Sequence, residues 1–205
     1  MSSFTALYES PDKSAKTFLF AENKEELSQL RRQHRDIIVS LREPFVPTPK
    51  TGVLKMLRLA GVKPSDTLYD LGCGDGRIPI MAAEHFGAKA VGVELRRDLF
   101  EETSRRVREM HLEDRVKILR RDFMKVSLRR ASVVALYLRS KTLTELIPKF
   151  KRELPHGARI VTYWYSIPGW EPSKKTQLIG REIHRYGREK YIDRRFEVEI
   201  SLYLR

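Results

Sequence analysis

A short segment rich in glycine and acid, YDLGCGDGR at residues 69–77, has the spacing of a ligand-binding loop. Asp70 and Asp75 are its acids, and three glycines alternate with other residues at Gly72, Gly74 and Gly76. Glycine permits backbone turns that other residues avoid, and it lets a ligand lie against bare main chain. Phosphate-binding loops carry a lysine or the spacing G-x-G-x-x-G. Two carboxylates would repel an anion, so we expect this loop to bind a cationic ligand.

The residues around this segment indicate the elements that position it. An apolar, β-branched run, 67–69, leads into Asp70, and the helical pattern Ile78, Ile80, Met81, Ala83 follows the loop. This order predicts a strand, a tight loop and a helix. Asp70 would stand at the carboxyl end of the strand, where it could accept a hydrogen bond from an amine or a hydroxyl.

Two further predicted strands are also followed closely by acids. Residues 90–94 form a strand that ends at Glu94, roughly twenty residues past the loop, where an acid can bind the ribose hydroxyls of a nucleoside. Residues 116–119 form a third strand, followed by Asp122 and Phe123. The carboxyl ends of parallel strands share one edge of a sheet, so these acids and the glycine loop should lie together.

This pattern resembles motif I, acid-x-G-x-G-x-G, of the class I S-adenosylmethionine-dependent methyltransferases. The resemblance implies that the glycine loop holds the methionine end of S-adenosylmethionine, Glu94 the ribose diol, and Asp122 and Phe123 the adenine; the product would be S-adenosylhomocysteine. The implied cofactor-binding residues are Phe45, Thr48, Asp70, Gly72, Gly74, Asp75, Gly76, Glu94, Leu95, Asp122, Phe123 and Leu136.

A closer resemblance rests on two segments, EPFVPTP at 43–49 and LYDLGCGDGRI at 68–78. Together they are similar to the archaeal broad-specificity protein lysine methyltransferases and their mitochondrial relatives, and distantly to the non-SET-type histone lysine methyltransferase. The similarity implies that Phe45 and Thr48 border the methionine end of the cofactor and the entrance for a target lysine. The prolines of 43–49 alternatively make only a rigid linker.

Repeated strand and helix patterns predict an α/β fold, namely a seven-stranded class I methyltransferase (Rossmann-like) sheet with helices on both faces. A final pair of strands, 178–186 and 196–204, would form an antiparallel hairpin. The other predicted strands are 67–71, 89–93, 116–119, 132–138 and 158–165, and the predicted helices are 52–60, 77–86, 97–111 and 141–153.

The first forty residues lie outside both resemblances. Residues 1–20 carry no clear pattern, whereas 21–42 place apolar side chains at helical spacing. We therefore expect an N-terminal helical extension over 1–43, which either packs on the catalytic domain or binds a partner, and a methyltransferase domain over 44–205.

Aromatic residues follow the fourth and fifth predicted strands, namely Tyr137 and the run Tyr163, Trp164, Tyr165. A lysine amine has a pKa of about 10.4 and must lose a proton before attack, which a desolvating aromatic channel promotes. We expect a substrate channel lined by Phe45, Tyr137, Tyr163, Trp164 and Tyr165, with Tyr137 and Trp164 catalytic, although each aromatic taken singly could be a core residue. Alternation would put Tyr163 and Tyr165 on one face of the strand and Trp164 on the other.

Composition bounds the partners and the compartment. A net charge of +13 and a pI near 10.0 suit an acidic partner such as nucleic acid or a nucleoprotein. The same charge is consistent with surface ion pairs of a thermophile, because charged residues reach 33% and Asn23 is the sole asparagine. Cys73 is either a redox-sensitive thiol or a small residue packed under the cofactor. We expect no metal site, no membrane span, a cytoplasmic location and a monomer.

The segment after the fourth strand, 135–140, reads ALYLRS. Methyltransferases that act on bases or on glutamine carry Asn/Asp-Pro-Pro-Tyr/Phe at this place, so the departure disfavours base methylation. The sequence therefore predicts a protein lysine N-methyltransferase, with nucleic-acid-associated proteins such as those of chromatin among its substrates. The alternatives are an RNA methyltransferase and a non-catalytic cofactor-binding chromatin module.

Overall fold

A computed structural model of the chain describes residues 4–9, 16–21, 43, 45–186 and 190–205. The chain divides into two compact units, Met1–Val46 and Pro47–Arg205. In the first unit, β1 (Phe4–Glu9) pairs antiparallel with β2 (Lys16–Ala21). The sequence showed no clear pattern over 1–20, and these two strands were missed. Each is only six residues long and carries little alternation. The helix predicted over 21–42 lies outside the described residues, apart from Ala21, which ends β2.

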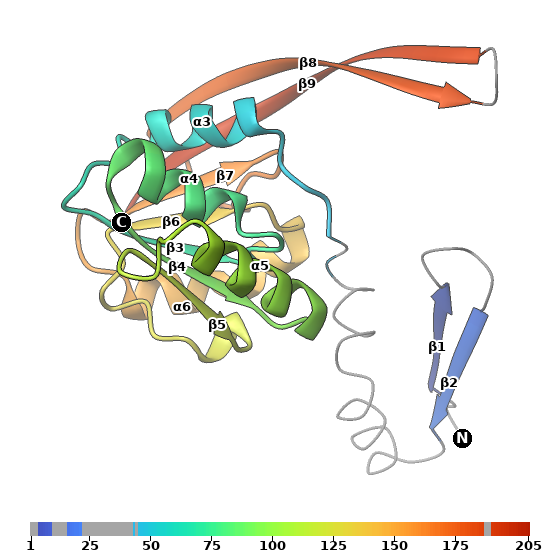
Figure 1. Ribbon diagram of the computed structural model, residues 1–205, viewed down its shortest axis with the longest axis horizontal. Coiled ribbons are helices and arrows are strands. Elements are labelled where there is room, and N and C mark those ends of the chain that lie inside the picture. The colour runs from blue at the N-terminus through green and yellow to red at the C-terminus, as the bar shows by residue number, and fades with distance from the viewer. Residues whose placement is uncertain (1–3, 10–15, 22–42, 44, 187–189) are drawn as a thin grey trace. The chain divides into compact units, whose positions relative to one another are not determined.

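The second unit contains the predicted seven-stranded sheet in the order β5-β4-β3-β6-β7-β9-β8, as Figure 1 shows. Strands β3 to β7 are parallel, and β9 joins β7 antiparallel. The elements are α3 (Lys50–Leu59), β3 (Thr67–Leu71), α4 (Arg77–Phe86), β4 (Lys89–Glu94), α5 (Arg97–Glu109), β5 (Val116–Arg120), the 3-10 helix η1 (Phe123–Lys125), β6 (Val133–Leu136), α6 (Ser140–Glu153), β7 (Arg159–Tyr163), β8 (Lys174–Tyr186) and β9 (Lys190–Leu204).

Helices cover both faces of this sheet, as the sequence predicted. Buried side chains of α3 and α4, such as Leu57 and Ile80, form one core with strand residues including Leu68. Side chains of α6, such as Leu146 and Phe150, form a second core on the other face. The strands are therefore buried on both sides, which explains why they read as nearly continuous apolar runs.

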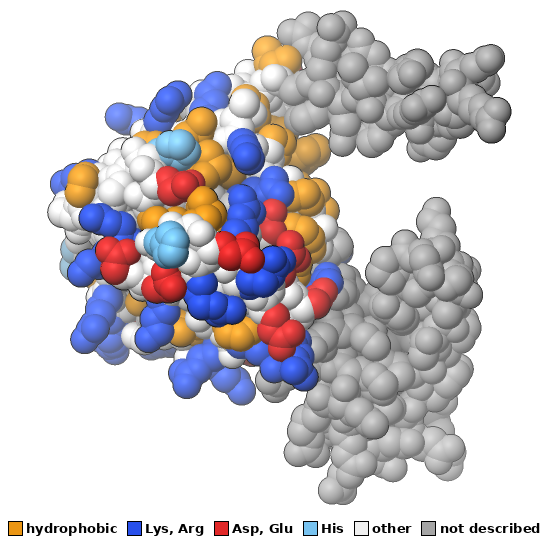
Figure 2. Space-filling view, in the orientation of Figure 1, with side chains coloured by type: hydrophobic (Ala, Val, Ile, Leu, Met, Phe, Trp, Pro, Cys, Tyr) orange, Lys and Arg blue, Asp and Glu red, His pale blue; other side chains and the backbone are white. Residues whose placement is uncertain are grey.

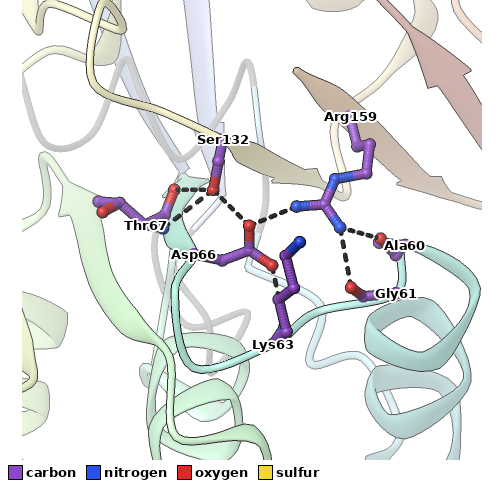
Figure 3. A network of polar contacts seen from close by, with 7 residues as sticks. All are labelled: Ala60, Gly61, Lys63, Asp66, Thr67, Ser132 and Arg159. Carbon is purple, nitrogen blue, oxygen red and sulfur yellow. Dashed lines mark hydrogen bonds and ion pairs between the residues drawn. The ribbon is translucent and has the colours of Figure 1, made fainter. Parts of the chain in front are cut away.

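A buried polar network joins the amino ends of the central strands (Figure 3). Asp66 Oδ1 accepts hydrogen bonds from the hydroxyl of Ser132, at 2.8 Å, and from the guanidinium of Arg159. The same guanidinium donates to the carbonyls of Ala60 and Gly61, each at 2.8 Å. The network thereby ties the end of α3 to the residues that precede β3 and β6, at the edge opposite to the glycine loop.

The last two strands are longer than predicted. β9 lies between β7 and β8, and its pairing with β7 runs from Tyr163↔Ile200 to Arg159↔Leu204. Its pairing with β8 continues outward to Tyr186↔Lys190, so the outer half of the hairpin pairs only with itself and projects from the sheet in Figure 1. The pattern predicted 178–186 and 196–204 and missed only the first residues of each strand.

Candidate active site

The glycine loop between β3 and α4 has the backbone that its sequence predicts. Gly72, Gly74 and Gly76 have φ angles of +85°, +55° and +74°, a region that other residues rarely adopt. The backbone N–H groups of Gly72 and Cys73 donate to the carbonyl of Val93 at 2.8 and 3.0 Å, which fastens the loop to the end of β4. The loop is therefore held in a fixed shape at the carboxyl edge of the sheet.

Glu94, at the end of β4, also holds this loop. Its Oε2 accepts from the N–H of Gly74 at 2.9 Å, and its Oε1 accepts from the N–H groups of Leu95 and Arg96, both at 2.8 Å. Burial raises the pKa of the Glu94 carboxyl against the lowering effect of these backbone donors. Oε1 has both lone pairs engaged, whereas Oε2 has one left for a further donor, so the predicted binding of ribose hydroxyls by Glu94 stays a prediction compatible with the geometry.

Asp70, the penultimate residue of β3, is the buried acid of the site. Its side chain is 2% exposed, and its Oδ2 has no hydrogen-bond partner among the described residues. Burial raises the pKa of Asp70 well above its ordinary value, and the charges of Glu94 and Asp75 raise it further. A buried carboxylate oxygen without a donor is costly, and a cationic ligand would relieve that cost.

Asp75 differs from Asp70 because it has a cationic partner. The Arg77 Nε donates to Asp75 Oδ1 at 2.8 Å and Arg77 Nη2 donates to Oδ2 at 2.5 Å, a bidentate pair. Partial burial raises the pKa of Asp75, but the bonds and charge of Arg77 outweigh that effect and bring the pKa below its ordinary value. The negative charge of Asp75 is thus balanced within the loop, whereas that of Asp70 is not.

The residues predicted at the adenine end lie on three neighbouring segments of the same edge. Asp122 caps η1, since its Oδ1 accepts from the N–H of Met124 at 2.9 Å, and its other oxygen remains for a ligand. Phe123 and Leu95 are partly exposed, and Leu136 is fully buried at the end of β6. Leu136 therefore supplies core packing beneath the edge, and its predicted contact with a cofactor remains untested.

The tyrosines that follow β6 and end β7 form one cluster. The rings of Tyr137 and Tyr163 meet edge to face with centroids 5.0 Å apart, and Tyr137 stacks on Tyr165 at 6.4 Å. Burial and the neighbouring Tyr137 raise the pKa of Tyr163 to about 12. Burial and Tyr165 likewise raise the pKa of Tyr137. The phenols of Tyr137 and Tyr163 therefore stay neutral near pH 7 and offer aromatic faces rather than a phenolate base.

Trp164 leaves the strand instead of continuing it. Its φ is +71°, its side chain is 47% exposed, and its backbone N–H donates to the backbone carbonyl of Glu199 at 2.9 Å. The predicted strand 158–165 is consequently shorter, and simple alternation through Tyr165 fails at this residue. A bulky residue held in the left-handed region is a strained conformation of the kind found at functional sites.

The proline-rich segment precedes α3. The side chain of Thr48 is buried, and a Cβ placed on Gly52 would come within 2.8 Å of the ring of Tyr163 and 3.3 Å of Thr48 Cγ2. Gly52 thus allows α3, Thr48 and Tyr163 to pack closely. Phe45 belongs to the first unit and is 40% exposed, so its predicted place at the site stays a prediction.

Cys73 is packed inside the loop. A Cβ on Gly92 would lie 2.8 Å from its Sγ, and burial, followed by the charges of Asp70 and Glu94, raises the pKa of the thiol well above its ordinary value. A buried thiol with a raised pKa is poorly reactive, which favours the packing interpretation over redox sensing.

Two residues that support the site were absent from the predicted set. Thr103 on α5 donates to the carbonyl of Gly74 at 2.8 Å, and Arg77 donates from Nη1 to the carbonyl of Thr48 at 2.7 Å. The sequence signal for Thr103 is a single polar residue in an apolar stripe with Leu99 and Val107. Neither contact follows from spacing alone, because each joins segments far apart in the chain.

Taken together, the site fits S-adenosylmethionine, whose α-amine and sulfonium are cationic. Asp70 provides an unpartnered buried carboxylate, and the glycines leave main chain open to a ligand. The bound cofactor would supply an electrophilic methyl group, while the residues of the chain bind it, exclude water and orient the acceptor. Among the described residues, no cluster of His, Cys, Asp and Glu could hold a metal ion, and no helix is long and apolar enough to cross a membrane.

Basic residues are spread over the visible face, with acids among them (Figure 2). Several arginines of α5 have acidic partners, including Arg97 with Glu101 at 2.6 Å and Arg105 with Glu109 at 2.9 Å. Such pairs agree with the ion-pair interpretation of the composition.

Comparison with known proteins places the chain in a family. Residues 70–174 match the family model described as ANTKMT methyltransferase domain. A protein-lysine N-methyltransferase of Saccharolobus islandicus is 39% identical over 132 residues, which cover 64% of this chain and 82% of that protein. The mouse adenine nucleotide translocase lysine N-methyltransferase is 34% identical over 67% of this chain, which spans only 60% of that relative.

A solved structure supports the cofactor. The crystal structure of an RNA methyltransferase from Salinibacter ruber, in complex with S-adenosyl-L-homocysteine, superposes with a TM-score of 0.66 and 31% identity over 78% of this chain and 93% of that chain. The resemblances found in the sequence are thereby confirmed, as are the S-adenosylmethionine cofactor and the class I fold. The chain belongs to the ANTKMT methyltransferase domain family and is an S-adenosylmethionine-dependent methyltransferase.

Proposed function

We propose that this protein methylates the ε-amine of lysine residues in other proteins. The observation that carries the proposal is the tyrosine cluster of Tyr137, Tyr163 and Tyr165, at the same edge of the sheet as Asp70. The 39% identity to the archaeal protein-lysine N-methyltransferase supports the same acceptor.

The cluster suits an amine acceptor for a physical reason. A lysine amine must lose its proton to attack a methyl group, and an aromatic, poorly solvated surface lowers the pKa of an ammonium. The ring faces also attract the cation and can hold it in line with the methyl group. Because the phenols of Tyr137 and Tyr163 stay neutral, desolvation and positioning supply the rate enhancement rather than proton abstraction by these two tyrosines.

The acceptor proteins are proposed from charge. A chain with a net charge of +13 attracts acidic proteins and protein–nucleic-acid assemblies at long range. We therefore propose acceptors with acidic surfaces or with bound nucleic acid, which include chromatin proteins.

Methylation of RNA is the second candidate, because the Salinibacter ruber protein, at 31% identity, is an RNA methyltransferase. The ALYLRS sequence that follows β6, in place of a base-binding Asn/Asp-Pro-Pro-Tyr/Phe, disfavours it. A non-catalytic module is disfavoured because the glycine loop and Asp70 retain the complete cofactor motif.

The direct test is transfer of radiolabelled methyl from S-adenosylmethionine to two fractions of one lysate, nuclease-treated protein and protein-free RNA. Mass spectrometry of labelled bands should find methyl-lysine. Glu94→Ala should give no label, because Gly74 of the loop loses its hydrogen bond to the Glu94 carboxylate. Label in the RNA fraction alone would replace the lysine proposal with the second candidate. Label in neither fraction would contradict both.

The role of the cluster is tested by substitution at Tyr137. Tyr137→Phe keeps the aromatic face and should retain most of the activity, whereas Tyr137→Leu should lower kcat about three- to thirtyfold, the range of a cation–π contact. The measurement is kcat with a lysine acceptor at saturating cofactor. Equal losses in both variants would assign the role to the hydroxyl instead.

A further inference from the structure

Arg77, the first residue of α4, contacts two segments that meet at the active site. Two of its donor groups hold the Asp75 carboxylate, and its Nη1 donates to the carbonyl of Thr48 at 2.7 Å. The Arg77 side chain is 23% exposed, so this contact is largely shielded from water. One guanidinium therefore connects the glycine loop to the segment that enters α3.

Within the part of the chain that the structure describes, the segment around Thr48 has few other polar attachments. Pro47 and Pro49 have no backbone N–H, so the main chain here cannot join a strand. Pro49 precedes α3, and its carbonyl accepts from the N–H of Val53 at 3.0 Å, which is a contact within the start of the helix. Among the described residues, the hydrogen bond from Arg77 is the polar contact that joins this stretch to the glycine loop.

This attachment reaches the tyrosine cluster through close packing. Thr48 Cγ2 and the Tyr163 ring both lie against the place where Gly52 lacks a side chain, at 3.3 and 2.8 Å from an ideal Cβ. Tyr163 in turn contacts Tyr137. Arg77 and Thr48 thus connect the cofactor loop to the packing around Gly52, against which the rings proposed to receive the acceptor lysine lie.

The glycine loop has several attachments besides the ion pair of Arg77 with Asp75. The loop is held by the bonds of Gly72 and Cys73 to Val93, of Gly74 to Glu94, and of Thr103 to the carbonyl of Gly74. Loss of Arg77 would leave these bonds in place and would release the segment at Thr48. Cofactor binding and acceptor positioning should consequently respond differently to a change at this residue.

We infer that Arg77 is a positioning residue that holds the Pro47–Pro49 segment against the glycine loop, so that the acceptor side of the site is aligned with the bound cofactor. This inference rests on the proposed function only for the identity of the acceptor. The guanidinium does not take part in the chemistry. A lysine at this position could donate to Asp75 or to Thr48, but it lacks the planar fork that serves both at once.

The test compares Arg77→Gln, Arg77→Lys and the control Arg105→Gln, which removes an exposed arginine paired with Glu109 on α5. We expect Arg77→Gln to lower kcat tenfold or more on whichever acceptor the wild type modifies, while the S-adenosylmethionine Kd from calorimetry changes less than threefold. Arg77→Lys should recover part of kcat. The control should match the wild type in both quantities.

Hydrogen exchange of the peptide that spans 45–54 provides a readout that needs no acceptor. With cofactor bound, this peptide should exchange faster in Arg77→Gln than in the wild type, and peptides of the glycine loop should not. A Kd that rises as much as kcat falls would overturn the inference in favour of direct cofactor binding. Unchanged exchange at 45–54, or a general loss of protection, would also overturn it. An inactive wild type would refute the proposed acceptor and leave the exchange result decisive.

Discussion

At the scale of single residues, the two acids of the glycine loop illustrate how environment separates like groups. Asp75 is ion-paired with Arg77, whereas Asp70 is buried with one oxygen that has no hydrogen-bond partner among the described residues. The pKa of the first lies below its ordinary value and that of the second well above it. One carboxyl therefore stabilises the loop, and the other is left for a ligand.

Asp70→Asn should affect stability and binding in opposite directions. Because the pKa of Asp70 is raised, the free folded protein binds more protons than the unfolded chain above pH of about 4, and its stability falls as pH rises to the raised pKa. Asparagine has no carboxyl to titrate, so Asp70→Asn does not lose stability in this way as the pH rises. At pH 8 the variant should therefore unfold at a higher temperature than the wild type. Thermal unfolding across pH 4–8 measures the difference, which should vanish at the acid end.

The same variant should bind S-adenosylmethionine about ten- to a hundredfold more weakly, because it loses a charged hydrogen bond. Binding to the wild type should release a proton, since a cation lowers the pKa of Asp70, and calorimetry in two buffers of different ionisation enthalpy would detect it. An unchanged affinity would mean that another group receives the cationic end of the cofactor.

Gly76 offers a second test at this scale, because the cost of backbone strain at its φ of +74° can be separated from the cost of a side-chain clash. A Cβ there would lie 2.3 Å from Thr103 Cγ2, whereas one on Gly169, at φ +73°, would have nothing within 4 Å. Gly169→Ala should cost about 1 kcal/mol of unfolding free energy from strain alone, and Gly76→Ala about 2–4 kcal/mol from strain and overpacking. Denaturant unfolding measures both.

The double variant Gly76→Ala with Thr103→Ser removes the clashing methyl and should recover the part due to overpacking. If the double variant is no more stable than Gly76→Ala, the cost at this position comes from backbone strain rather than from Thr103.

At the scale of elements, the strand and helix order was predictable, and the points of failure have physical causes. The alternation of apolar runs and helical stripes located the α-helices and strands from α3 to β7 but not η1, because a sheet buried on both faces leaves a strong pattern and a three-residue helix does not. The pattern could not show that β7 ends at Tyr163, since nothing in the sequence indicates that Trp164 adopts a left-handed backbone conformation. β1 and β2 were missed because two six-residue strands carry little periodic signal.

The candidate site likewise contains residues that local sequence signals predicted and contacts that they did not predict. Asp70, Glu94, Asp122 and the glycines were found because acids and glycines after strands are local signals. The contacts of Arg77 and Thr103 were not found, because they depend on how α3 and α5 pack against the loop.

Arg159→Lys tests how the amino ends of the strands are joined. Lysine cannot bridge Asp66 and the carbonyls of Ala60 and Gly61 together, so buried acceptors lose their donors and the variant should lose about 1–3 kcal/mol of unfolding free energy. Urea unfolding measures the change. The cofactor Kd should stay at the wild-type value, because the network lies at the opposite edge of the sheet. A weakened Kd would show that the two edges are coupled.

At the scale of the whole molecule, the net charge of +13 should set how acceptors are found. For acceptors that carry the same target peptide, KM should rise with salt between about 50 and 300 mM for an acidic carrier and stay level or fall for a basic one, because screening shortens long-range attraction and repulsion alike. Initial rates with the two carriers measure this. The same salt response for both carriers would mean that the ion pairs seen on α5 leave no net steering field.

The position of β9 between β7 and β8 has a consequence for synthesis on the ribosome. The hairpin partner of β8 and the neighbour of β7 are the same strand, and that strand is translated after both of them. During elongation, β7 is therefore a sheet edge with its hydrogen-bonding groups unpaired, and β8 has no strand to join. The parallel part and its cofactor loop can form first, and the sheet becomes complete only when β9 inserts between its two neighbours.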